Sequence, residues 1–147
     1  MNTEEIAEIV DIEDKIDDSG IVDRYDLFVS KSLGFIEKCL IPLSREQGYL
    51  KETVQYSRAY RQKAVDGEQL KLYAIEFNKK LLDIPNKQEK AIAKFIYWFV
   101  DEDFLNGITP EWQQDSSLSY MLDALYEVCD DLSLCKKFCD FLLSEQS

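Results

Sequence analysis

The chain has 147 residues, of which 46% are hydrophobic, and a net charge of −12 at pH 7 because 29 acidic residues outnumber 17 basic ones. A chain of this length can bury a hydrophobic core of its own, so we expect a single domain over residues 1–147. The acidic balance argues against direct nucleic-acid binding, since an anionic surface repels phosphate backbones.

The N-terminal segment and the hydropathy pattern bear on where the protein works. Met1 is followed by an acidic stretch rather than by the basic start and apolar run of a signal peptide. No apolar run approaches the roughly 20 residues that a membrane-spanning helix needs. We therefore expect a soluble, cytoplasmic protein that does not bind membranes.

The histidine and cysteine content excludes the commonest site chemistries. The chain has no histidine, so it lacks the commonest general base and the usual partner of a nucleophilic serine or cysteine. Its cysteines lack the paired C-x-x-C spacing of a zinc site, and in the cytoplasm they are expected to stay reduced. They are Cys39, Cys129, Cys135 and Cys139. The sequence therefore predicts no enzyme activity, no metal site and no cofactor.

The N-terminal part of the chain predicts two helices. Isoleucines at helical spacing indicate a first helix that ends at Ser19–Gly20. A second helix begins near Asp23. It stops near Ile41, because Pro42 disfavours helical geometry in the residue before it.

The middle of the chain predicts three further helices, each opened by a capping motif. Residues 44–47 read Ser-Arg-Glu-Gln, the spacing of a capping box, and the helix that they begin runs to about Val65. Residues 66–69 and 86–89 repeat the same logic for the next two helices, and Pro85 separates them. The last of the three is strongly apolar and is predicted to occupy the centre of the core. Its apolar side chains are Ile92, Phe95, Ile96, Phe99 and Val100.

The C-terminal part predicts one irregular stretch and two helices. Residues 101–117 lack a helical period, and the two helices that follow are joined near Asp130–Asp131. No segment shows the alternation of a β-strand, and no repeat of solenoid period is present. The predicted fold is all-α, a compact bundle of about seven helices.

Charge is unevenly distributed along the chain. Residues 1–26 carry ten acidic and two basic residues, residues 27–97 carry eight and thirteen, and residues 98–147 carry eleven and two. The bases of the middle block are expected to pair with the acidic blocks on either side. A strongly acidic field attracts basic protein surfaces, although acidic helices can also serve solubility alone.

Acidic and aromatic residues occur together just after the central helix, and we interpret this stretch as the candidate partner-binding site. The residues are Asp101, Glu102, Asp103, Phe104 and Trp112. Consecutive carboxylates can steer a basic partner by charge, and the aromatic rings can supply area for anchoring.

Other features have a simpler interpretation. Glu4, Glu8 and Asp11 share one face of the first helix without an exposed aromatic residue, so they are expected to be solvated carboxylates. They lack the glycine-containing twelve-residue loop of a calcium site. Trp98 lies in the apolar central helix and is expected in the core.

Residues 56–70 carry a family resemblance. Their sequence, Tyr-Ser-Arg-Ala-Tyr-Arg-Gln-Lys-Ala-Val-Asp-Gly-Glu-Gln-Leu, describes a helix that breaks at Asp66–Gly67 and resumes as a second, capped helix. With the small size, the acidity and the all-helical pattern, this segment resembles helical immunity proteins of bacterial polymorphic toxin systems, such as contact-dependent inhibition or type VI secretion. The resemblance implies an acidic inhibitor that blocks a cognate toxin, often a basic nuclease, at its active site or substrate surface. It identifies no individual site residue.

Two other classes of function stay open. A cytosolic adaptor or secretion chaperone without enzymatic activity would bind through an exposed apolar groove instead of an acidic surface. An enzyme of unfamiliar type would have to use buried tyrosine, aspartate or arginine residues. The first expectation remains a basic protein partner, in particular a toxin domain.

Overall fold

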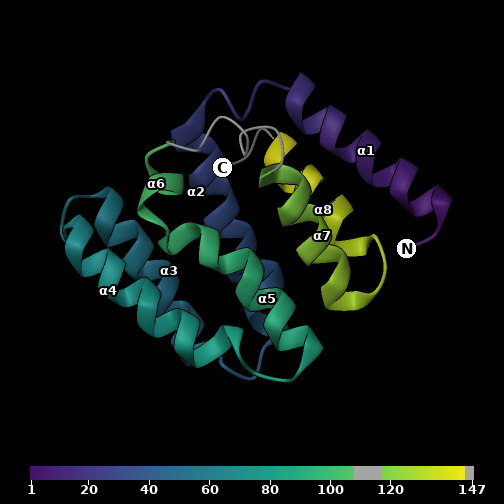
Figure 1. Ribbon diagram of the computed structural model, residues 1–147. Coiled ribbons are helices and arrows are strands. Elements are labelled where there is room, and N and C mark those ends of the chain that lie inside the picture. The colour runs from purple at the N-terminus through teal and green to yellow at the C-terminus, as the bar shows by residue number, and fades with distance from the viewer. Residues whose placement is uncertain (108–116, 145–147) are drawn as a thin grey trace.

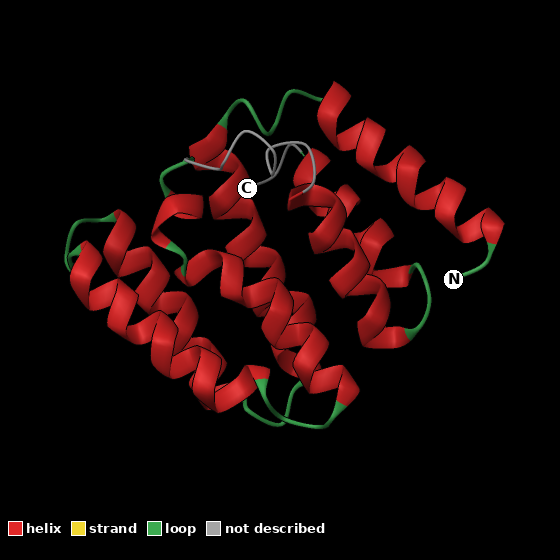
Figure 2. Cartoon of the chain, viewed as in Figure 1, coloured by secondary structure: helices red, strands yellow, loops and turns green. Residues whose placement is uncertain are grey.

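The computed structural model describes residues 1–107 and 117–144, and every regular element within them is helical (Figure 2). These described residues form eight α-helices, α1 (Thr3–Asp18), α2 (Tyr25–Phe35), α3 (Gln47–Arg61), α4 (Gly67–Phe77), α5 (Lys87–Tyr97), α6 (Glu102–Leu105), α7 (Ser117–Cys129) and α8 (Ser133–Leu143). The predicted all-α bundle is confirmed, and α6 is the helix that the sequence pattern did not predict.

Short turns of tighter or wider helix extend several of these elements. π-Helical turns continue α2 over Ile36–Leu40 and α4 over Asn78–Leu82. 3-10 turns follow at Ile41–Leu43 and Trp98–Val100. The second helix therefore leaves α-geometry before its proline, and Pro42 stands at the start of the 3-10 turn, where it needs no backbone donor.

Helix α5 runs through the middle of the bundle (Figure 1). The antiparallel pair α3 and α4 lies on one side of it, and α7, α8 and α1 lie on the other. Helix α8 packs against both α1 and α2. None of the described helices is both long and apolar enough to cross a membrane.

The core is built around phenylalanine rings from three helices. Phe35 of α2, Phe95 of α5 and Phe138 of α8 meet with ring centroids 5.0 to 5.9 Å apart. On α5, Ile92 and Ile96 are also completely buried. The predicted central position of this helix is confirmed.

Helix ends show where local sequence determines structure. Asn2 and Glu5 form a capping box at the start of α1, and Gly20 takes a positive φ of 75° just beyond its end. Helix α4 opens with the predicted capping box, in which the Asp66 side chain accepts from Gln69 N at 2.8 Å and Gln69 Oε1 accepts from Asp66 N at 2.9 Å. Both motifs satisfy backbone N–H groups that the first helical turn leaves unpaired.

The predicted capping box at Ser44 is wrong. The Ser44 hydroxyl is buried and donates to Glu89 Oε2 at 2.7 Å, while its oxygen accepts from Glu46 N at 2.9 Å, two residues on rather than three. Helix α3 begins later, with Glu46 at its N-cap and no side-chain cap. It also ends at Arg61 rather than near Val65, because Lys63 turns the chain with a φ of 64°.

The basic middle block pairs with both acidic ends, as predicted. Arg61 bonds to Asp26 at 2.7 Å. Lys94 of α5 lies 3.6 Å from Glu127 of α7, and Lys87 bonds to Asp130 at 2.5 Å. These pairs join segments far apart in sequence, although exposed pairs of this kind add little stability individually.

Candidate functional site

The stretch that follows the central helix is ordered by Asp101. Its carboxylate accepts from Phe104 N at 3.0 Å and thereby caps α6. Asp101 is half-buried and is one of the residues that line two hollows of the surface. Asp101 therefore has a structural role and is also available to a partner.

Glu102 and Asp103 lie on the outer side of the same short helix. Glu102 packs against the start of α4, because a Cβ placed on Gly67 would lie 1.7 Å from Glu102 Oε2. A carboxylate at this position is favoured by the N-terminal end of the α4 dipole. Asp103 is exposed. Glu102 therefore has a packing role in the fold, whereas Asp103 is accessible to solvent.

Phe104 is a correction to the predicted site. Its side chain is 4% exposed, and its ring lies 5.2 Å from that of Trp98 and 5.4 Å from that of Phe99. The short helix turns this side chain inward, so Phe104 supports neighbouring rings and offers no exposed area for anchoring. Trp112, the other aromatic residue of the predicted site, lies outside the described residues.

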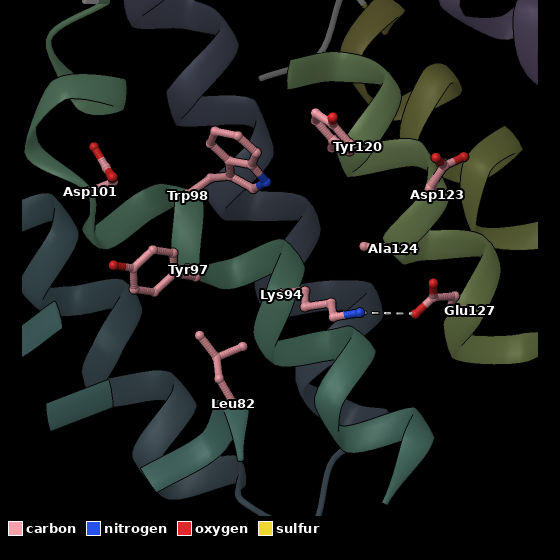
Figure 3. Close-up of a pocket in the computed structure, with 9 residues that line it drawn as sticks. All are labelled: Leu82, Lys94, Tyr97, Trp98, Asp101, Tyr120, Asp123, Ala124 and Glu127. Carbon is pink, nitrogen blue, oxygen red and sulfur yellow. Dashed lines mark ion pairs between the residues drawn. The ribbon is translucent and has the colours of Figure 1, made fainter. Parts of the chain in front are cut away.

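A pocket of about 550 Å³ lies between the end of α5 and α7 (Figure 3). The α5 side contributes Lys94, Tyr97, Trp98 and Asp101, and Leu82 closes one end. Helix α7 contributes Tyr120, Asp123, Ala124 and Glu127. The pocket thus combines aromatic walls with three carboxylates and one ammonium group.

The aromatic rings of the pocket are partly accessible. Trp98 was expected in the core, but it is half-buried and its indole borders the cavity. Tyr120 is 58% exposed and faces it from α7. Tyr97 separates this pocket from a second, smaller hollow.

The ionisable groups of the pocket influence one another. Burial, and then the negative charge of Glu127, raises the pKa of Asp123. Burial and the nearby Asp101 carboxylate raise the pKa of the Tyr97 hydroxyl. Lys94 offsets part of this negative charge through its ion pair with Glu127 (Figure 3). A cation placed in the pocket would therefore be stabilised by carboxylates that are short of positive partners.

The second hollow, of about 290 Å³, continues the first on the other side of Tyr97. It is lined by Asp101, Glu102 and Asp103 together with residues of α4, including Ile75 and Lys71. We call the residues of both hollows the α4–α5–α7 face. It contains five carboxylates on two sides of an aromatic centre, those of Asp101, Glu102, Asp103, Asp123 and Glu127.

Sequence reasoning missed the α7 side of this face. Tyr120, Asp123 and Glu127 stand three and seven residues apart, which places them along one helical face. That spacing is visible in the sequence. The sequence does not show which side of α7 faces α5, because tertiary packing decides this.

The acidic face of α1 is different in kind. Its Glu8 is paired with Lys136 at 3.6 Å, and Glu5 accepts a hydrogen bond from the Tyr126 hydroxyl at 2.9 Å. These contacts attach α1 to α7 and α8. No pocket among those found in the described residues is lined by Glu4, Glu8 or Asp11.

The cysteine thiols differ in how far they are buried. Cys135 and Cys139 are buried in α8, and Cys129 is exposed at the end of α7. Burial raises the pKa of Cys135 to about 12, and its Sγ donates to Leu122 O at 3.2 Å. Within residues 1–107 and 117–144, no group of three or more cysteine, aspartate or glutamate side chains is arranged to hold a metal ion.

Comparison with known proteins gives no relative: no protein-family model, curated protein or solved structure matches the chain.

Proposed function

We propose that the protein binds a basic partner protein through the α4–α5–α7 face and neutralises it, as an immunity protein neutralises a toxin. The observation that carries this proposal is the pocket between α5 and α7, in which accessible aromatic rings are surrounded by carboxylates. Carboxylates steer a basic partner and aromatic rings anchor it once it has docked.

The proposed mode of action is occlusion. A nuclease holds its substrate with basic residues around the active site, and carboxylates can take the place of the phosphates that those residues bind. A protein with a net charge of −12 is suited to this competition. A basic nuclease domain is thus the proposed target, and the inhibitor needs no catalytic group of its own.

An adaptor or secretion chaperone is the second candidate, and one observation favours it. Leu72 and Ile75 of α4 are 63% and 48% exposed, and Ile75 borders the smaller hollow. An apolar partner segment could use these side chains. Carboxylates line the same hollow as Ile75, which makes a basic partner the better match.

The test begins with affinity capture of the partner and mass spectrometry, followed by expression of the captured domain in bacteria. We expect a basic domain that arrests growth alone and is harmless when this chain is expressed with it. A captured partner that is not toxic, or whose toxicity this chain leaves unchanged, would contradict the proposed function.

The surface is tested with two charge-matched triple variants. One combines Asp101→Asn, Asp123→Asn and Glu127→Gln. The other changes Glu4→Gln, Glu8→Gln and Asp11→Asn. We expect the first to weaken binding by at least about tenfold, mainly through slower association, and the second to have little effect. The reverse order would place the interface on α1.

A further inference from the structure

The pocket between α5 and α7 has the chemistry of a site for one particular side chain. Its walls are the rings of Tyr97, Trp98 and Tyr120, and its charged groups are the carboxylates of Asp101, Asp123 and Glu127 with the ammonium of Lys94. Carboxylates outnumber the single cation. An anionic or purely apolar occupant would add no positive partner for these carboxylates, whereas an organic cation would match both the rings and the excess negative charge.

The aromatic part of the pocket is held in place from beneath. The Trp98 ring rests on the buried Phe104 ring, with centroids 5.2 Å apart, and Phe104 in turn contacts Tyr25 and Phe99. Figure 3 shows Trp98 and Tyr120 on facing helices at the same end of the pocket. A flat group that enters between these helices would meet an indole that is already positioned.

Arginine fits this arrangement better than lysine. A guanidinium group is planar, stacks on an indole face and donates two parallel hydrogen bonds to a carboxylate. It also loses less hydration than an ammonium group when it is covered. Asp101 on one side of Trp98 and Asp123 on the other supply acceptors at the rim of the pocket.

Lys94 already places one positive charge beside the carboxylates of the pocket. Its Nζ lies 3.6 Å from Glu127 Oε2, and both side chains are substantially exposed. An exposed pair at this separation is weak. The ammonium of Lys94 thus partly neutralises the pocket and repels an incoming cation.

We infer that the pocket between α5 and α7 receives an arginine side chain of the partner protein, stacked against Trp98 and paired with the surrounding carboxylates. This inference rests on the proposed function, because it names the anchor by which a basic partner would be held. The partner accordingly carries an exposed arginine in the surface that this chain covers.

The test uses the full chain and synthetic peptides at low salt, with binding measured by fluorescence anisotropy. The probes are an oligoarginine, an oligolysine of equal length and a neutral leucine-containing peptide. We expect the oligoarginine to bind more tightly than the oligolysine. Trp98→Leu should weaken oligoarginine binding by about tenfold and remove most of that preference. Tyr120→Leu, at an exposed position that does not endanger folding, should act in the same direction.

Lys94 supplies a variant that gains affinity. Lys94→Gln should bind oligoarginine about twofold to fivefold more tightly than the wild-type protein. The matched control is Lys90→Gln, which removes an equal charge from an exposed position on the same helix, outside the pocket lining. Equal gains in the two variants would show that only the net charge matters and would overturn the inference.

Other results also decide the matter. If Trp98→Leu and Tyr120→Leu both leave oligoarginine binding unchanged, the arginine site is not in this pocket. Preferred binding of the leucine-containing peptide in the wild-type protein would overturn the inference in favour of an apolar occupant. Growth rescue from a toxin without any pocket-dependent peptide binding would refute the inference alone, whereas pocket-dependent peptide binding without a neutralised toxin would refute the proposed function alone.

Discussion

Glu89 shows how one buried carboxylate can connect distant parts of the bundle. It lies in the first turn of α5, is 8% exposed, and accepts from the Ser44 hydroxyl at 2.7 Å and from Arg45 N at 2.6 Å. Its own backbone N–H is capped by Asn86. The beginning of α5 is thereby attached to the turn before α3 by hydrogen bonds to a charged acceptor, which are stronger than neutral ones.

Removal of this carboxylate should be costly. Glu89→Ala leaves the Ser44 hydroxyl and the Arg45 N–H without their acceptor, and we expect the free energy of unfolding to fall by about 2 to 4 kcal/mol. Glu89→Gln keeps an oxygen acceptor, so its free energy of unfolding should lie between those of Glu89→Ala and the wild-type protein. Urea denaturation measures both, with Lys90→Ala, at the exposed neighbouring position, as the control. Equal stability of Glu89→Ala and the control would show that solvent replaces both hydrogen bonds.

Asp123 gives a pH dependence of defined sign. Burial and the charge of Glu127 raise its pKa in the folded protein, so the folded state holds this proton more tightly than the unfolded state. The resulting stabilisation is complete below the unfolded pKa and is lost as the pH rises through the folded pKa. Glu13 faces the same region, and its pKa is also raised, by burial first and then by acidic neighbours that include Asp123.

We therefore expect Asp123→Asn to be more stable than the wild-type protein near neutral pH and to lose that advantage below about pH 4. Thermal denaturation across this pH range measures the difference. Asp131 provides a comparison of opposite sign, because hydrogen bonds from Ser133 lower its pKa. Asp131→Ala should thus lose stability at neutral pH and approach the wild type in acid. A gain for Asp123→Asn that persists in acid would indicate a packing effect.

At the scale of elements, two similar sequence motifs have different outcomes. Asp66 and Gln69 form their capping box because both side chains are exposed and have no stronger partner. Ser44 and Gln47 have the same spacing, yet the Ser44 oxygen accepts from Glu46 N rather than from Gln47 N, and the Ser44 hydroxyl donates to Glu89 of another helix. A local motif predicts a helix start reliably only where tertiary contacts leave its side chains uncommitted.

The capping box of α4 can be tested directly. Asp66→Ala removes the acceptor for Gln69 N, and we expect it to lower the free energy of unfolding by about 1 kcal/mol. Gln69→Ala leaves that bond in place and should cost less. Urea denaturation of the two variants gives the comparison. A larger loss for Gln69→Ala than for Asp66→Ala would contradict the assigned roles.

The candidate site shows the limit of what the sequence predicts. The sequence indicates Asp101, Glu102 and Asp103 because they are consecutive, but it does not indicate that Phe104 is buried, because a four-residue helix turns this side chain inward. The α7 contribution could not be predicted from spacing alone. It depends on how α5 and α7 pack, and the charge pattern does not contain that information.

At the scale of the whole molecule, the fold changes what the charge pattern means. Lys87 and Lys94 of the basic middle block are brought onto Asp130 and Glu127, so part of the C-terminal acidity is neutralised internally. Asp101 and Asp123 are instead gathered around the pocket from segments on its two sides. In the folded protein, the acidic residues are therefore divided between ion pairs on the surface and an acidic face around the pocket.

The central position of α5 also has a consequence for exchange with solvent. Ala91, Ile92, Phe95 and Ile96 are completely buried, whereas α1 buries only Ile9, Ile12 and Ile16 over sixteen residues. Amide protons in α5 should exchange with deuterium only when the whole domain unfolds, and those in α1 through opening of that helix alone. Mass spectrometry should find peptides from α1 fully deuterated while those from α5 remain protected, and equal rates in the two helices would mean that they open as one unit. On this scheme α1 detaches and returns many times between successive openings of the helix at the centre.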